Sequence, residues 1–260
     1  MEKKINKGSL KSLYDGLQVL QVVADTGDRI SVREVSQLTG IKESTIGKIL
    51  NVFQQYDYVR MVPGTKEYGL SFKILEHSER LLDTIDVRRI AMSFVQRFAE
   101  EIGESTGITL YQNGDMVYVA RFELPRIIRI RSKVGSKASY HCTSSGKVAL
   151  AFLPQEDAEA VWNKIELNSR TSKTITDIEV LRREIERVRE IGYAITHEES
   201  IEGIVGIGAP LFDHQGIFVG AVSVSCLSST TDDDRVVEIG EKLVVLSKEI
   251  SHSLGNSKVY

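Results

Sequence analysis

Two groups of hydroxyl-bearing residues have a spacing that suits a binding site for a small anion. His141 to Gly146 is a run of small, mostly polar residues that opens a predicted helix. The start of a helix presents free backbone amides and a positive dipole end, here beside Ser144 and Ser145. Ser223 and Ser225 are two residues apart, so they share one face of a predicted strand. A cavity between the two serine pairs would suit a carboxylate; the alternatives are a helix cap and a solvated sheet face.

The sequence motifs of common enzymes are absent from the chain, which argues against catalysis. It contains no G-x-S-x-G elbow, P-loop, G-x-G-x-x-G or H-E-x-x-H pattern. Neighbours on a strand point to opposite faces, so Cys142 beside His141 does not indicate a paired nucleophile. We therefore expect no enzyme, no cofactor and no metal. The alternatives to a protein that only binds its ligand are a metal- or redox-responsive protein that uses Cys142, Cys226 and histidines, and then a small-molecule enzyme.

Length and composition predict a folded chain of two domains. The chain has 260 residues, of which 42% are hydrophobic and 27% charged, and domains typically have roughly 100–200 residues. No run approaches the roughly 20 apolar residues of a membrane helix, and the N-terminus has no secretory signal. Two cysteines do not make a disulfide framework. We expect a cytoplasmic protein that does not associate with membranes.

Charge is distributed unevenly along the chain. Residues 1–73 carry 11 basic and 8 acidic side chains, a net charge of +3, whereas the remaining residues carry 22 basic and 28 acidic, a net −6. A basic N-terminal third suggests an anionic partner for that third.

The N-terminal third has the pattern of a winged helix-turn-helix. Ser31 and Glu34 form a capping box, and Gly40 supplies the turn between two short helices. A Pro-Gly turn then joins two short strands, which predicts the wing. The predicted elements are helices over 9–24, 31–38 and 42–57 and strands over 58–62 and 67–70.

Exposed cations and hydroxyls on the second helix and wing suit a DNA duplex. Lysine neutralises phosphate, and serine or threonine contacts phosphate or base edges. Glu43 argues mildly against DNA, and the alternative is a winged helix used only for dimerisation. The candidate DNA-contacting residues are Ser31, Lys42, Ser44, Thr45, Lys48, Arg60 and Lys66.

The rest of the chain predicts a linker helix and an antiparallel α+β domain. The domain boundaries that we expect are 1–70 for the DNA-binding domain, 71–86 for the linker helix and 87–260 for the effector-binding domain. Within the last, the predicted helices are 87–103, 145–152, 155–164, 177–191 and 232–254. The predicted strands are 106–111, 116–122, 126–131, 193–196, 203–212 and 217–226. This order does not alternate strand and helix as parallel dinucleotide-binding folds do.

Three stretches of this sequence resemble the IclR-type family of bacterial transcriptional regulators. They are SVREVSQLTGIKESTIGKIL, YHCTSSGKVALAFLP and IGYAITHEESIEGIVGIGAPLFDHQGIFVGAVSVS. The first is similar to the family's helix-turn-helix, the second to its pocket-entry helix and the third to its C-terminal signature. The likeness extends from about Ser9 to Leu254.

The resemblance implies a winged helix-turn-helix domain, a linker helix and a GAF-like antiparallel α/β effector domain. It implies a homodimer or homotetramer that binds a double-stranded DNA operator and responds to a small organic acid or aromatic catabolite. Gly47 departs from the family pattern in the recognition helix, which implies a different operator. Thr196 and Gly206 stand where acid-binding members often carry more strongly interacting side chains, which implies a pocket that is wider or takes a different ligand. The ligand contacts that the resemblance implies are Ser144, Ser145, Thr196, Gly206, Ser223 and Ser225. We expect a transcriptional regulator, a repressor rather than an activator, controlled by a small carboxylate.

Overall fold

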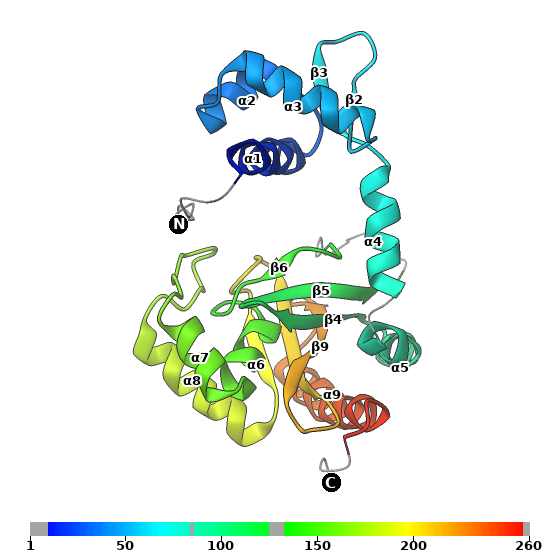
Figure 1. Ribbon diagram of the computed structural model, residues 1–260. Coiled ribbons are helices and arrows are strands. Elements are labelled where there is room, and N and C mark those ends of the chain that lie inside the picture. The colour runs from blue at the N-terminus through cyan, green and yellow to red at the C-terminus, as the bar shows by residue number, and fades with distance from the viewer. Residues whose placement is uncertain (1–9, 84–85, 125–132, 257–260) are drawn as a thin grey trace. The chain divides into compact units, whose positions relative to one another are not determined.

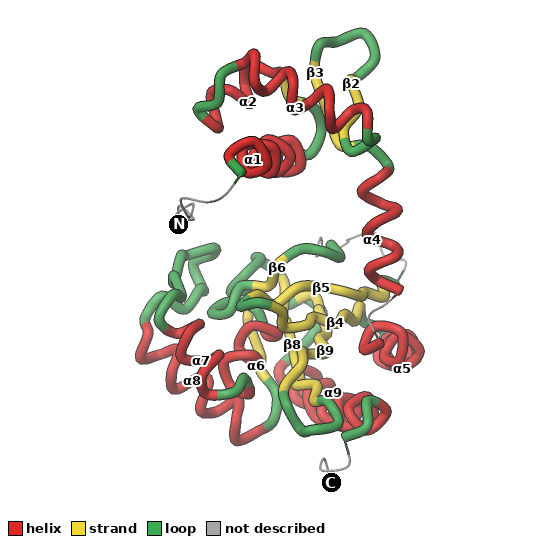
Figure 2. The backbone as a smooth tube through the Cα atoms, in the orientation of Figure 1, coloured by secondary structure: helices red, strands yellow, loops and turns green. Residues whose placement is uncertain are grey.

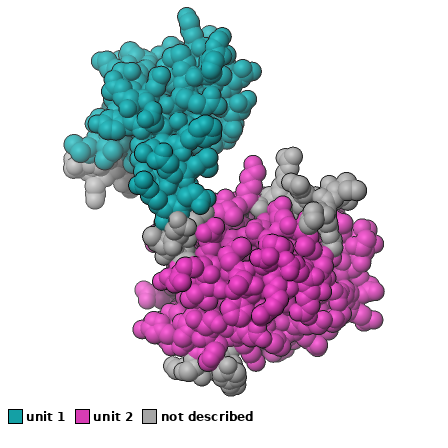
Figure 3. Space-filling view, turned by 90° about the vertical axis from the view of Figure 1, so that its right-hand side faces the viewer, with its two compact units in different colours: residues 1–84 teal, residues 85–260 magenta. Residues whose placement is uncertain are grey.

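The computed structural model describes residues 10–83, 86–124 and 133–256, and it divides the chain into two compact units (Figure 1, Figure 3). The units are Met1–Thr84 and Ile85–Tyr260. Each has its own hydrophobic core. The division falls inside the expected linker 71–86, whose helical part is α4 (Lys73–Asp83).

The N-terminal unit is a small helical domain with a three-stranded sheet. Its first elements are α1 (Lys11–Thr26), β1 (Ile30–Ser31), α2 (Val32–Thr39), α3 (Glu43–Gln55), β2 (Val59–Met61) and β3 (Glu67–Leu70). The sheet order is β1-β3-β2, and both pairs are antiparallel. The helices and the β2–β3 hairpin agree with the predicted winged helix-turn-helix. The two-residue strand β1 was not predicted.

The start of α2 confirms the capping box. The Ser31 hydroxyl accepts a hydrogen bond from the Glu34 amide at 3.3 Å, and the Glu34 carboxylate accepts one from the Ser31 amide at 2.9 Å. The Ser31 hydroxyl also donates to the Glu34 carboxylate at 2.6 Å, and the hydrogen bonds from this hydroxyl and from the Ser31 amide lower the pKa of Glu34. A cap of this kind stabilises a helix by about 1 kcal/mol. At the other end of α2, Gly40 adopts a left-handed conformation with φ of 72°, which glycine reaches without steric cost.

The C-terminal unit is built on a six-stranded antiparallel sheet (Figure 2). Its strands are β4 (Ser105–Gln112), β5 (Asp115–Phe122), β6 (Lys137–Ala138), β7 (Ala194–His197), β8 (Ile204–Phe212) and β9 (Phe218–Leu227), in the order β6-β5-β4-β9-β8-β7. Its helices are α5 (Asp86–Ile102), α6 (Ser144–Phe152), α7 (Gln155–Trp162), α8 (Ile178–Ile191) and α9 (Asp233–Ser253). The predicted antiparallel α+β class is confirmed. The predicted strand 126–131 lies outside the described residues, and the short β6 was not predicted.

Helices cover both faces of this sheet, and β9 shows why. Val222 and Val224 belong to the core that β9 shares with α5 and α9, whereas Ala221 belongs to the core formed with α6, α7 and α8 (Figure 1). Side chains alternate between faces along a strand, so Ser223 and Ser225 lie on the same face as Ala221. Among the described residues, no helix has the length and apolar character needed to span a membrane.

Candidate functional site

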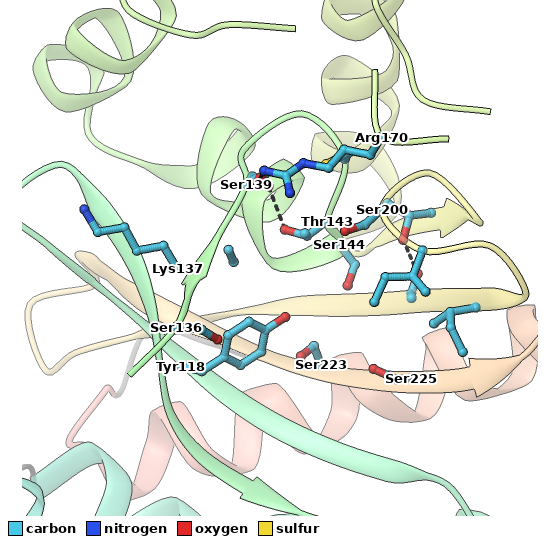
Figure 4. A pocket seen from close by; sticks show the side chains of 16 residues that line it. Tyr118, Ser136, Lys137, Ser139, Thr143, Ser144, Arg170, Ser200, Ser223 and Ser225 are labelled. Carbon is cyan, nitrogen blue, oxygen red and sulfur yellow. Dashed lines mark hydrogen bonds between the residues drawn. The ribbon is translucent and has the colours of Figure 1, made fainter. Parts of the chain in front are cut away.

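A cavity of about 300 Å³ lies between the N-terminus of α6, strands β5 to β9 and the loop after α7 (Figure 4). Five of the six residues expected to contact an effector line it: Ser144, Thr196, Gly206, Ser223 and Ser225. These residues come from four different elements, α6, β7, β8 and β9. The fold therefore brings together positions that are up to 81 residues apart in the chain.

The register of the sheet accounts for the floor of the cavity. Thr196 pairs with Gly206 on β8, and Gly206 pairs with Ser225 on β9. A Cβ atom on Gly206 would lie 2.6 Å from the Thr196 hydroxyl oxygen and 3.2 Å from that of Ser144, and one on Gly208 would lie 3.0 Å from the Ser144 carbonyl carbon. The two glycines therefore allow α6 to approach the sheet closely.

Buried hydroxyls line two walls of the cavity. Ser144 on α6 is 5% exposed and Ser223 on β9 is 7% exposed, and neither side chain makes a hydrogen bond with the described residues. Thr143 caps α6 by accepting a hydrogen bond from the Gly146 amide at 3.1 Å. The Ser144 amide, at the start of the helix, has no acceptor in the described part of the chain. Ser144 and Ser223 line the cavity, so their hydroxyls are available to a bound molecule.

Ser145 does not line the cavity, contrary to expectation. It is fully buried, and within the described residues its hydroxyl has no hydrogen-bond partner. Successive residues on an α-helix point about 100° apart. When Ser144 faces the cavity, Ser145 therefore faces the interior behind it.

Several lining residues were not predicted from the sequence, and the most consequential is Arg170. Its Nη2 donates a hydrogen bond to the Ser139 hydroxyl at 3.3 Å, and no carboxylate of the described residues lies within ion-pair distance of it. Lys137 also lines the cavity, but it pairs with Asp115 at 2.5 Å. Arg170 lies in an aperiodic loop between α7 and α8, so no pattern in the sequence marked it. No lining residue is a carboxylic acid.

A buried ion pair supports the cavity from behind. The ammonium nitrogen of Lys147, a fully buried residue, lies 2.7 Å from Oε1 of Glu199 and 3.5 Å from Oε1 of Glu184. Burial raises the pKa of Glu199, and the nearby Lys147 opposes that shift. Lys147 lies one turn after Ser144 on α6, and Glu199 precedes the lining residue Ser200. The pair therefore joins two walls of the cavity.

The two cysteines do not lie together. Cys142 lines the cavity, and burial raises the pKa of its thiol. Cys226 lies in the core on the other face of the sheet. Burial lowers the pKa of His141, whose Nε2 is 3.0 Å from the Asn168 carbonyl oxygen. In residues 10–83, 86–124 and 133–256, no three His, Cys, Asp or Glu side chains form a group suited to a metal. The cysteine arrangement gives the metal- or redox-responsive alternative no support.

The candidate DNA-contacting residues separate into two groups. Exposed side chains are Lys42, Ser44, Lys48, Arg60 and Lys66, and Thr45 is half-buried. The four cations among them have no carboxylate within ion-pair distance in the described part of the chain. Ser31 differs because its hydroxyl is held in the capping box with Glu34.

Two residues of the N-terminal unit, Lys48 and Arg33, have features that the sequence did not predict. Lys48 also lines an apolar groove between α1 and α3 together with Leu13 and Leu17, so its aliphatic part has a packing role that the sequence did not show. Arg33 is exposed in the first turn of α2, and within the described residues it has no ion-pair partner. It is a further candidate for a phosphate contact.

Family models match most of the chain. Residues 13–63 match the IclR helix-turn-helix domain, and residues 79–252 match the model described as the bacterial transcriptional regulator IclR C-terminal. The chain belongs to the IclR family. It is a DNA-binding transcriptional regulator with an N-terminal helix-turn-helix domain, and regulators of the IclR family bind DNA operators and small-molecule effectors.

Individual relatives agree with the family over nearly the full length. The transcriptional regulator XynR of Escherichia coli K12 is 25% identical, with 95% of this chain and 98% of XynR covered. The transcriptional repressor AllR of the same strain is 26% identical, with 98% and 93% covered. The crystal structure of the Thermotoga maritima IclR matches with a TM-score of 0.76 and 29% identity, covering 95% of this chain and all of that one.

The Lys147–Glu199 pair generates a stability prediction. In Lys147→Met, the Glu199 carboxylate loses its partner inside the protein, and breaking a buried pair in this way costs about 3–5 kcal/mol. The loss in the free energy of unfolding should become smaller as the pH falls through the raised pKa of Glu199, because the protonated carboxyl carries no charge. Denaturant unfolding followed by the fluorescence of Trp162, the single tryptophan, measures the C-terminal unit.

The matched control is Lys248→Met on α9, where the lysine is exposed. It should change the free energy of unfolding by about 0.5 kcal/mol or less. Equal destabilisation by both variants would show that the buried pair has no special role in the fold.

Proposed function

We propose that this IclR-family chain is a repressor that binds a palindromic operator as a homo-oligomer and is controlled by a small organic acid, without chemical turnover. The observation that carries the effector half is the cavity beside α6. It combines many hydroxyls, a helix N-terminus and the cations Arg170 and Lys137, and none of its lining residues is acidic. This combination favours a carboxylate. The proposed contacts are Ser144, Thr196, Gly206, Ser223 and Ser225.

Unpaired surface cations support operator binding by the N-terminal unit. Lys42 at the start of α3 and Arg60 and Lys66 on the hairpin are exposed. In helix-turn-helix proteins the second helix enters the major groove with its N-terminal residues at the base edges. Ser44 and Thr45 occupy that position on α3. The relative AllR is named a repressor, and this name supports repression over activation here.

Exposed apolar residues on α1 and α3 support pairing of two copies. Leu13, Leu17 and Val52 line a groove on the N-terminal unit, and Leu17 is 58% exposed. Water-exposed apolar surface of this kind marks association sites, and a two-fold dimer would place two α3 helices over two half-sites. Two such dimers would form a homotetramer.

The proposed control is a shift between two arrangements of the oligomer. The acid binds one arrangement of the C-terminal units more tightly than the other. The free energy by which it shifts the equilibrium between the two arrangements equals the difference between its binding free energies for them. Helices α4 and α5 follow each other in the chain. A conformational change in the C-terminal unit therefore reaches the DNA-binding unit through these two helices.

Operator binding should depend on Lys42 through phosphate neutralisation. Selection from a random duplex library should enrich a palindrome, and Lys42→Ala should weaken its binding and lower the salt slope by about one. Gel shifts at several salt concentrations measure both quantities. Lys248→Ala on α9 is the control and should leave the slope unchanged. No enrichment at low salt would contradict operator binding, and an unchanged slope in Lys42→Ala would remove Lys42 from the interface.

Pairing should depend on the α1–α3 groove. Leu17→Glu places a charge in the apolar surface, so the mass measured by light scattering should fall to half or less of the wild-type value. Leu38→Glu on α2 is the matched control, because Leu38 is also exposed but does not line the groove. An unchanged mass for Leu17→Glu would place the interface elsewhere, and a monomeric wild-type protein would exclude the dimer.

Effector response should depend on the β9 hydroxyls. The double variant Ser223→Ala/Ser225→Ala should bind the operator like wild type, yet need at least tenfold more acid for release, because two hydrogen-bonding groups of the floor are gone. Release of labelled operator by a panel of organic acids provides the measurement. Ser253→Ala on α9 serves as the control. A full response by the double variant would show that the acid binds at another site.

A further inference from the structure

Hydroxyl groups dominate the lining of the cavity. Of the 16 residues that line it, nine carry a hydroxyl (Figure 4). They are Tyr118, Ser136, Ser139, Thr143, Ser144, Thr196, Ser200, Ser223 and Ser225. A hydroxyl both donates and accepts hydrogen bonds, so this lining matches a molecule that carries alcohol groups. Ser136, Ser139, Thr143 and Thr196 already take part in hydrogen bonds within the protein. An alkyl or aromatic acid would cover Ser144, Ser223 and Ser225 without giving their hydroxyls partners, which costs binding free energy.

The hydroxyls lie on opposite walls rather than at one end. Ser144 projects from α6, and Ser223 and Ser225 lie on β9 across the cavity (Figure 4). Ser144 and Ser223 are more than nine-tenths buried and make no recorded hydrogen bond from their side chains. A ligand with a single polar end would satisfy one wall only. A carbon chain with hydroxyls along its length satisfies both.

One cation at the rim has donors to spare. Lys137 is paired with Asp115, whereas the recorded hydrogen bond of the Arg170 side chain, among the described residues, is the one to Ser139. A guanidinium has five donors in a planar fork that fits both oxygens of a carboxylate. Arg170 therefore has the chemistry to select a carboxylate over a neutral polyol.

The loop that carries Arg170 is fastened to the cavity wall. The Arg170 amide donates to the Thr174 hydroxyl at 2.9 Å, and that hydroxyl donates to the Glu199 carbonyl at 2.7 Å. The Thr171 hydroxyl donates to the Glu198 carbonyl at 2.7 Å. These bonds fix the backbone of Arg170 beside Ser200, another lining residue. A backbone held in this way keeps the guanidinium close to the cavity, so less conformational freedom of the loop is lost on binding an anion.

We infer that the cavity takes a polyhydroxylated carboxylate of the aldonate or uronate class, with Arg170 pairing with the carboxylate and the serine and threonine hydroxyls pairing with the alcohol groups. The inference rests on the proposed function, since it concerns the same cavity. A volume of about 300 Å³ accommodates an acid of this class.

Isothermal titration of the full-length protein with matched probes tests the ligand class. The probes are the five- and six-carbon aldonates, D-glucuronate, D-galacturonate, hexanoate, 4-hydroxybenzoate and the neutral polyol sorbitol. At least one sugar acid should bind at least tenfold more tightly than hexanoate, 4-hydroxybenzoate and sorbitol. Equal or tighter binding of hexanoate or 4-hydroxybenzoate, or no binding of any sugar acid, overturns the class.

Matched arginine variants test the assignment of Arg170. Arg170→Gln should bind the best sugar acid at least tenfold more weakly than wild type. The affinity of Arg170→Lys should lie between the affinities of wild type and Arg170→Gln. Arg183→Gln removes an exposed arginine of α8 that does not line the cavity, and it should bind like wild type. Trp162 fluorescence verifies that each variant is folded. Equal binding by Arg170→Gln and Arg183→Gln overturns the role of Arg170.

Operator gel shifts with the same probes separate this inference from the proposed function. If a sugar acid binds in the predicted order but does not alter operator binding, the ligand class stands and the proposed control is wrong. If hexanoate or 4-hydroxybenzoate releases the operator and the sugar acids do not, the proposed control stands and the ligand class is wrong.

Discussion

The buried contact between Lys147 and Glu199 determines how the candidate site is assembled. An ammonium and a carboxylate 2.7 Å apart, both out of solvent, are each costly to bury alone. Each therefore holds the other in place. Lys147 fixes α6 and with it Ser144, while Glu199 fixes the turn before Ser200. The Glu199 carbonyl also accepts from the loop of Arg170 through Thr174. The ion pair thus positions three walls of the cavity without lining it.

Glycine provides the complementary constraint on the sheet side. Because Gly206 and Gly208 have no Cβ, the first turn of α6 lies directly over β8. The close approach buries Ser144 and Ser223 without giving their hydroxyls partners inside the protein. A molecule that pairs with these hydroxyls and binds only the folded unit stabilises that unit by mass action. The site is therefore arranged for occupancy by a polar ligand.

The features that could be predicted from sequence are those with a local cause. The capping box at Ser31, the glycine end of α2 and the alternation along β9 depend on residues a few positions apart, and the structure contains all three. The remaining features depend on contacts between distant segments. Arg170 reaches Ser139 across 31 positions from an aperiodic loop. Ser145 points away from the cavity because of the rotation of α6, and periodicity alone did not say which of two adjacent serines faces it.

The sheet of the C-terminal unit gives the proposed control a physical route. The cavity lies on the face covered by α6 to α8, and α5 packs on the opposite face in the core that contains Val222 and Val224. Ser223 lies between these two valines on β9, and β9 pairs with β4, which packs against α5. A ligand that moves β9 therefore acts on the core that contains α5. Helix α5 follows α4 in the chain. Closely packed interiors transmit small displacements rather than absorbing them. A ligand that prefers one position of β9 therefore biases the segment that leads to the DNA-binding unit. The free energy of this bias cannot exceed the difference between the ligand's binding free energies for the two positions.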